Sequence, residues 1–185
     1  MDIEKRIKDK RIKFSSYAED KMYREMLMNY ENKLFTTAAV MGSLLFERII
    51  TVRLIREPSI PVVLLKDNTI NEQLSLLKIK EEEVINGSTG KRGFSFKQIT
   101  TKLKDLNIID TDKKNKLDSF YDTYRNPILH HLSLRLFKTI FNREPIHTFE
   151  LDSMHDEMYE RLAKIVLKEI EDLSSNGGFV VNKTK

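Results

Sequence analysis

The sequence predicts an all-α protein, a helical bundle of about four to six helices, and three observations support this fold class.

 The chain of 185 residues has 32% charged residues but only six Gly and four Pro, a composition that favours helices over a turn-rich β-sandwich. Apolar residues recur at steps of three or four over long stretches, which is the period of an amphipathic helix. With 40% hydrophobic residues the chain can bury one core, so a single domain is expected over residues 16–173.

The longest helical pattern lies in the first third of the chain. Ser16 and Glu19 fit a capping box, in which each side chain satisfies an unpaired backbone N–H group, so a helix is expected from Tyr17. Apolar residues then continue at helical spacing to about Arg56, and Gly42 is a candidate interruption. The proline two residues beyond Arg56 ends the pattern, because the residue before a proline disfavours the helical conformation.

Residues 58–93 carry the weakest pattern, and we interpret them as a variable connection between the first helix and the rest of the bundle. Residues 71–85 are compatible with a helix, and residues 86–93 have the composition of a loop. A phosphate-binding loop is the alternative for residues 86–93. Their glycines lack the Gly-Lys-Ser/Thr ending that such a loop needs.

The helical pattern resumes at Phe96 and predicts two short helices that are separated at residues 107–110. Beyond them lies Pro127, for which two arrangements stay open. Asn126 caps a new helix with Pro127 at its first position, or Pro127 kinks one longer helix. In both cases the sequence predicts an irregular backbone at this point.

The two ends of the chain are predicted to lie outside the bundle. Residues 1–15 form a charged N-terminal arm, interpreted as a solvated or frayed helix end, with a nucleic-acid-binding arm as the alternative. An apolar run from residue 154 to residue 170 marks the last helix, which Asp152 or Ser153 is expected to cap. Residues 174–185 are predicted to form a flexible tail.

The composition also limits the classes of function. The chain has no cysteine, which excludes a disulfide framework, a thiolate metal site and a thiol nucleophile, and which suits the cytoplasm. Its first residues are charged, and no window reaches the roughly 18 apolar residues of a membrane span, so we expect no membrane partner. A net charge of +4 gives only a mild bias towards polyanionic partners.

Arg125 and His130 are the residues on which a functional hypothesis can be built. A guanidinium binds phosphate oxygens as a fork, and an imidazole exchanges a proton near neutral pH, so this pair suits phosphodiester cleavage without a metal. Five residues of a continuous helix turn about 500°, which leaves the two side chains about 140° apart. A break or kink at Pro127 is therefore needed to bring both to one cleft. The alternative is a surface ion pair for Arg125 and a packing contact for His130.

The segment from Tyr124 to His131, Tyr-Arg-Asn-Pro-Ile-Leu-His-His, resembles the signature of the HEPN superfamily, whose members are small helical bundles. The family pattern is an arginine, a polar residue beside it and a histidine after a short spacer, and Arg125, Asn126 and His130 match it. The resemblance extends more loosely to residues 35–56 and 94–173. In the first of these stretches, a glutamate resembles an acidic residue often found on an early helix of the bundle.

The resemblance implies a metal-independent endoribonuclease that cleaves RNA by attack of the ribose 2′-hydroxyl, in a toxin–antitoxin or phage-defence setting. It implies a homodimer whose two motifs face each other across a cleft, with a cognate antitoxin protein as a further partner and with no cofactor. His130 would act as general acid or base, Arg125 would stabilise the charged transition state, and Asn126 would orient the phosphate or the histidine. Three further residues take supporting roles: Glu47, His131 and Tyr124.

Two alternatives from other classes stay open. A catalytically silent helical domain would bind a nucleotide or a protein partner, and its docking surface would be the Met and aromatic stripe of the first helix, if that stripe is exposed. The stripe consists of Tyr23, Met26, Leu27 and Tyr30. A metal site formed by His130, His147 and His155 is the second alternative, although these residues lack a characteristic ligand spacing.

Overall fold

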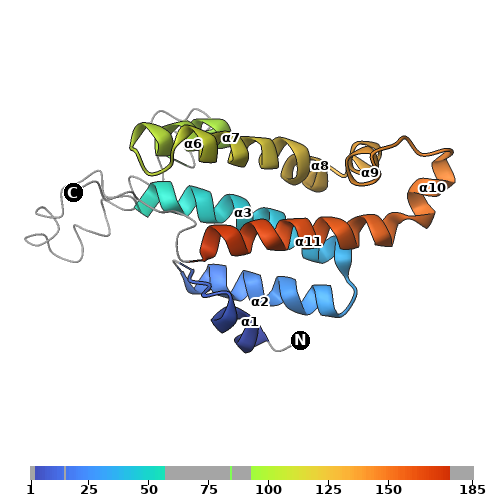
Figure 1. The fold of residues 1–185 in the computed structure, drawn as a ribbon, viewed down its shortest axis with the longest axis horizontal. Coiled ribbons are helices and arrows are strands. Elements are labelled where there is room, and N and C mark those ends of the chain that lie inside the picture. The colour runs from blue at the N-terminus through green and yellow to red at the C-terminus, as the bar shows by residue number, and fades with distance from the viewer. Residues whose placement is uncertain (1–2, 15, 57–83, 85–92, 176–185) are drawn as a thin grey trace, which may run out of the picture.

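The computed structural model describes residues 3–14, 16–56, 84 and 93–175, and the regular elements within these ranges are all helical (Figure 1). The predicted all-α class is therefore confirmed. No helix in these ranges is both long and apolar enough to span a membrane. The elements in chain order are α1 (Ile3–Asp9), α2 (Tyr17–Glu31), α3 (Phe35–Arg56), α6 (Phe96–Asp105), α7 (Thr111–Phe120), η1 (Tyr121–Arg125), α8 (Asn126–Leu129), α9 (Ser133–Phe141), α10 (Thr148–Ser153) and α11 (His155–Ser174).

Three predictions fall largely outside the described residues. They concern the connection over residues 58–93, its helix over residues 71–85, and the tail over residues 174–185. Within these ranges the structure describes Val84, which is buried, Gly93, and the first two residues of the predicted tail.

Helix α3 is the central element of the bundle. It packs against α2 and α11 and also against α6 and α8, so that helices cover it from several directions (Figure 1). Its sequence explains this position, because apolar residues lie on all sides of the helix, and a helix that is apolar all round is stable only when it is buried. Its fully buried side chains include Leu45, Phe46 and Ile50.

The prediction of one helical stripe from Tyr17 to Arg56 is wrong, because the chain turns between α2 and α3. Helix α2 ends at Glu31, and Lys33 adopts a left-handed backbone conformation with a φ of 61°. The two helices then pack side by side (Figure 1). Apolar spacing did not reveal the turn, because both helices bury a stripe of the same period.

Gly42 does not interrupt α3 but lies where α3 meets its two neighbours. A Cβ atom at this position would lie 2.6 Å from Cγ1 of Val166 in α11 and 2.7 Å from Cε of Met26 in α2. Glycine therefore permits a close approach of the three helices at this point. Glycine is needed at this position because it has no side chain, and not because its backbone is flexible.

The predicted helix ends are correct in part. The hydroxyl of Ser16 accepts a hydrogen bond from the backbone N–H of Glu19 at 3.3 Å, and α2 begins at the next residue after Ser16, as expected. The two short helices predicted from residue 96 onward are α6 and α7. The predicted cap of the last helix is wrong. Asp152 and Ser153 belong to α10, and α11 begins after Met154 without a side-chain cap.

The N-terminal residues pack onto the bundle. Glu171, near the end of α11, is buried and accepts hydrogen bonds from Arg6 Nε at 2.5 Å and from the Tyr23 hydroxyl at 2.9 Å. Burial and the neighbouring carboxylate raise the pKa of Tyr23, so its hydroxyl remains a donor. Ile12 is also buried. The segment over residues 3–14 is thus attached to α11 by polar contacts, and Ile12 joins it to the hydrophobic core.

The Met and aromatic stripe of α2 belongs to the core. Tyr23, Met26 and Leu27 are fully buried, and Tyr30 is half-buried with its ring centroid 5.5 Å from that of Phe35. The condition for a docking surface on this stripe, which was exposure, is therefore not met.

Candidate functional site

The motif residues lie at an irregular point in the helical path from α7 to α8. The five residues Tyr121–Arg125 form a π-helical turn, in which the N–H of Asn126 donates to the carbonyl of Tyr121 five residues earlier. Turns of this kind are rare in proteins, and those that occur are often found at functional sites. Arg125 and Asn126 both have right-handed helical dihedral angles, so Asn126 is not the cap of a new helix. The irregularity that was expected at Pro127 lies one turn earlier.

Because of Pro127 and the π-turn, one backbone carbonyl receives no hydrogen bond from a helical N–H group. The carbonyl of Asp122 would accept from the N–H of Asn126 in an α-helix, and from residue 127 in a longer π-helix. The N–H of Asn126 bonds elsewhere, and proline has none. Arg135 Nη2, from α9, donates to this carbonyl at 2.8 Å and replaces the missing donor. A long side chain thus stabilises the irregular turn.

The guanidinium of Arg125 is held from two sides. Its Nη2 pairs with the carboxylate of Glu47 in α3, and its Nη1 donates to the hydroxyl of Tyr121 at 3.1 Å. The carbon at the centre of the guanidinium lies 4.7 Å from the ring centroid of Tyr121, which stacks on Phe96 at 4.2 Å. Nε of Arg125 is buried and has no partner among the described residues. The orientation of this cation is therefore fixed by an ion pair, a hydrogen bond and a ring contact.

Burial raises the pKa of Tyr121, although the charge of Arg125 acts in the opposite direction. The phenol is therefore neutral at physiological pH and accepts the hydrogen bond from Arg125. A neutral Tyr121 adds no charge to the cluster, so Glu47 is the group that balances the arginine.

His130 lies at the C-terminal end of α8, and its side chain is exposed. Its backbone N–H donates to the carbonyl of Asn126 at 3.1 Å, and within the described part of the chain its imidazole has no hydrogen-bond partner. His131 follows with a left-handed φ of 50° and is also exposed. His131 thus ends the helix, while the ring of His130 is accessible to solvent. The side chain of Asn126 is half-buried.

The structure brings Glu47 and Tyr121 to Arg125 but does not bring His130 into the same cluster. The backbone is helical from Arg125 to the residue before His130, so these two side chains leave the helix about 140° apart. Arg125 faces α3, and His130 faces solvent. A substrate that contacts both groups would have to reach around the end of α8.

The alternative metal site is not formed. Among the residues that the structure describes, no group of three or more His, Asp or Glu side chains is placed to hold a metal ion. His155 instead packs against the ring of Tyr159 at 4.6 Å, and His147 lies near Phe149 at 6.2 Å.

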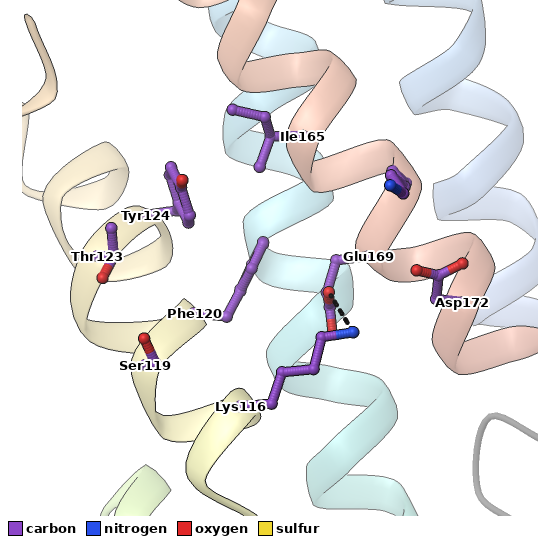
Figure 2. Close-up of a pocket in the computed structure, with 9 residues that line it drawn as sticks. Lys116, Ser119, Phe120, Thr123, Tyr124, Ile165, Glu169 and Asp172 are labelled. Carbon is purple, nitrogen blue, oxygen red and sulfur yellow. Dashed lines mark ion pairs between the residues drawn. The ribbon is translucent and has the colours of Figure 1, made fainter. Parts of the chain in front are cut away.

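A groove of about 500 Å³ lies beside the motif, between α7 and η1 on one side and α11 on the other (Figure 2). Tyr124, expected to support the motif, lines this groove and packs on Phe120 with ring centroids 5.3 Å apart. Ile165 and Glu169 line the opposite side, on α11. We refer to it below as the α7–α11 groove. Tyr124 therefore belongs to a different surface from the Arg125 cluster.

Sequence reasoning missed two residues of this region, Tyr121 and Arg135. Tyr121 precedes Arg125 by four residues, the spacing at which helical side chains meet, so the sequence did contain a signal for this pair. Pro127 indicated that a carbonyl would lose its donor. No sequence pattern identified Arg135 as the replacement, because it comes from a separate helix.

Comparisons of the chain with protein-family models, with curated proteins and with solved structures found no match. The resemblance to the HEPN superfamily therefore depends on the motif residues and their spacing.

Proposed function

We propose that the protein is a metal-independent endoribonuclease of the HEPN type that cleaves RNA by attack of a ribose 2′-hydroxyl on the adjacent phosphodiester. The observation that carries this proposal is an oriented guanidinium, Arg125, five residues before an exposed histidine, His130, whose imidazole has no hydrogen-bond partner among the described residues. The proposed setting is a cytoplasmic toxin–antitoxin or phage-defence system, in which an antitoxin protein restrains the enzyme.

Arg125 is suited to stabilise the negative charge that develops on the phosphate. Its orientation is fixed before the substrate arrives, and preorganised donors stabilise a transition state without the cost of reorganisation. The side chain of its partner Glu47 is 30% exposed, against 13% for that of Arg125, so solvent reaches the ion pair more readily from the Glu47 side. A phosphate oxygen that approaches from this side would compete with Glu47 for the guanidinium.

His130 is suited to proton transfer. The 2′-oxygen forms a bond to phosphorus as the bond to the 5′-oxygen breaks, so one group accepts the 2′-hydroxyl proton and another donates a proton to the 5′-oxygen. One imidazole cannot do both at the same moment. A homodimer, in which the partner copy supplies a second His130, would provide both groups, and Asn126 would orient the phosphate or the imidazole.

The test is cleavage of a mixed RNA pool in EDTA by the wild type, Arg125→Ala and His130→Ala, with His155→Ala as the matched histidine control. We expect the wild type and the control to produce 2′,3′-cyclic phosphate ends. Each motif variant should lose about a hundredfold or more in rate, the size of a lost acid–base or electrostatic group. Circular dichroism checks that each variant folds, and light scattering measures the mass in solution.

Absence of cleavage by the wild type, or equal cleavage by all four proteins, would remove the ribonuclease proposal. If an active enzyme has the mass of a monomer, the ribonuclease proposal would stand, but a site shared between two copies of the chain would be excluded.

A further inference from the structure

The α7–α11 groove contains a buried carboxylate that is only partly paired. The side chain of Glu169 is 8% exposed, and its Oε2 lies 3.6 Å from Nζ of Lys116, an exposed residue (Figure 2). The other oxygen, Oε1, is buried and has no donor among the described residues. Such an oxygen lowers the stability of the fold, because it has lost its water without gaining a hydrogen bond. A bound molecule that carries N–H donors would satisfy it.

The remaining surface of the groove combines an apolar wall with a rim that carries two lysines and the exposed carboxylate of Asp172. Phe120, Tyr124 and Ile165 supply two aromatic rings and an aliphatic side chain. Lys116 and Lys168 lie at the edge, and both are exposed. A flat ring with N–H groups on one edge and an attached phosphate would match these three features.

The charged residues that line the groove are two lysines, Lys116 and Lys168, and two carboxylates, Glu169 and Asp172. Burial lowers the pKa of Lys113, while the charges of Glu169 and Asp172 act in the opposite direction and that of Lys116 adds to the lowering. Glu169 thus pairs with Lys116 through Oε2, while its Oε1 atom has no hydrogen-bond partner among the described residues.

We propose that the α7–α11 groove binds a guanine ribonucleotide, with the base donating to Glu169 and the phosphate at Lys116 and Lys168. Guanine carries an imino and an amino N–H side by side on its Watson–Crick edge, which match the two oxygens of a carboxylate. Adenine and cytosine each place a ring acceptor beside the amino group, and uracil flanks its imino N–H with two carbonyls. Those acceptors would be repelled by the carboxylate.

The guanine has two sources, a free nucleotide or a residue of an RNA strand. Thr123, which lines the groove, precedes His130 by seven residues, roughly 10 Å along a helix axis, so a nucleotide near the cleaved bond is within reach. The RNA source therefore rests on the proposed ribonuclease function. Binding of guanine itself does not, because neither Arg125 nor His130 lines the groove.

The first experiment is calorimetric titration of the full chain with GMP, AMP, CMP and UMP. We expect GMP to bind at least about tenfold more tightly than the other three. Glu169→Gln should weaken GMP binding by about tenfold or more and abolish the preference, whereas Glu160→Gln, on the same helix outside the groove, should bind like the wild type. Equal binding of the four nucleotides, or no binding of GMP, overturns the proposal.

A second variant protects the test against a folding defect in Glu169→Gln. Lys168 is exposed, so Lys168→Glu leaves the core intact. It should weaken the binding of GMP by about tenfold but leave the binding of guanosine, which has no phosphate, unchanged. Equal losses for GMP and guanosine would contradict the assigned position of the phosphate.

A third measurement separates the source of the guanine from the catalytic proposal. A 2′-O-methyl oligonucleotide with one guanine cannot be cleaved by 2′-hydroxyl attack, so its affinity can be compared directly with that of GMP. Tighter binding of the oligonucleotide supports an RNA subsite, and tighter binding of GMP supports a free nucleotide. GMP binding by a wild type that cleaves no RNA would retain the guanine site and exclude the ribonuclease function. Cleavage of RNA by a wild type that does not bind GMP would retain the ribonuclease function and exclude the guanine site.

Discussion

The Arg125 guanidinium and the Glu47 carboxylate form an ion pair between η1 and α3 in which the cation is the more deeply buried partner. Arg125 is 13% exposed and Glu47 is 30% exposed. The two residues are far apart in the sequence, so the pair joins the motif to the central helix. Removal of Glu47 and removal of Arg125 should therefore cost different amounts of folding free energy. Water can solvate a carboxylate left without its partner better than it can solvate the more deeply buried guanidinium.

We predict that Glu47→Gln destabilises the fold more than Arg125→Met does. Glu47→Gln leaves a buried cation with only neutral partners and should cost about 2 kcal/mol, whereas Arg125→Met keeps the aliphatic stem and should cost about 1 kcal/mol. Chemical denaturation of both variants measures the difference. A larger loss for Arg125→Met would show that ring contacts, and not the ion pair, stabilise this interface.

The hydrogen bond from Arg135 to the carbonyl of Asp122 leads to a second prediction. Arg135→Ala should lower the free energy of unfolding by about 1 kcal/mol, because it leaves the carbonyl without its protein donor. The effect should shrink when Pro127→Ala is also present, since residue 127 then has an N–H to donate. A double-mutant cycle measures this coupling. Additive effects of the two substitutions would mean that Arg135 acts independently of the π-turn.

The sequence predicted the features of this fold that depend on local spacing and local chemistry. The start of α2 directly after Ser16 follows from a cap, and the separation of α6 from α7 follows from an interruption of the apolar pattern. The turn at Lys33 did not follow, because apolar residues continue at the same spacing on both sides of it. The spacing of apolar residues shows which residues share a helix face, but it does not show where the chain reverses direction.

The candidate site was predictable in its chemistry but not in its geometry. Arg125 and His130 were identified by residue type and spacing, and Glu47 was identified only through a resemblance. The π-turn changes the course of the helix before Arg125, while the expected irregularity was at Pro127. Glu169 was not identified, because a glutamate on an amphipathic helix gives no sign in the sequence that one of its oxygens is buried.

Glu150 is predicted to make the stability of the fold depend on pH in the acidic range. The guanidinium of Arg143 and the backbone N–H of Ile146, the latter at 2.6 Å, donate to its carboxylate and lower its pKa from 4.5 to about 2. A lowered pKa in the folded state means that the carboxylate stabilises the fold above about pH 4.5, and that this contribution is lost as the pH falls towards about 2. Glu150→Gln lacks this contribution at every pH.

The measurement is the thermal unfolding midpoint of the wild type and of Glu150→Gln over the same pH range. The wild type should be the more stable at neutral pH, and the difference should close between about pH 4.5 and about pH 2. Glu144→Gln provides the control, because Glu144 pairs with Lys138 at 2.5 Å on the same exposed part of the chain. A difference that does not change with pH would show that Glu150 acts through packing.

Gly42 provides the last prediction, which tests the packing of the three central helices. Gly42→Ala improves helix propensity by about 1 kcal/mol, but the new Cβ would lie 2.6 Å from Cγ1 of Val166 and 2.7 Å from Cε of Met26. Met26 is flexible at this end, whereas the branched side chain of Val166 is not. Gly42→Ala should therefore lower the free energy of unfolding by about 2 kcal/mol in total.

The double variant Gly42→Ala with Val166→Ala identifies which contact is responsible. Val166→Ala alone leaves a cavity in the core and should be destabilising, because Val166 is fully buried. The added methyl group at residue 42 would fill part of that cavity, so the double variant should be more stable than the sum of the two single losses predicts. Strictly additive losses in chemical denaturation would mean that α3 and α11 move apart to accept the methyl group, and that the close approach at Gly42 contributes little to the stability of the bundle.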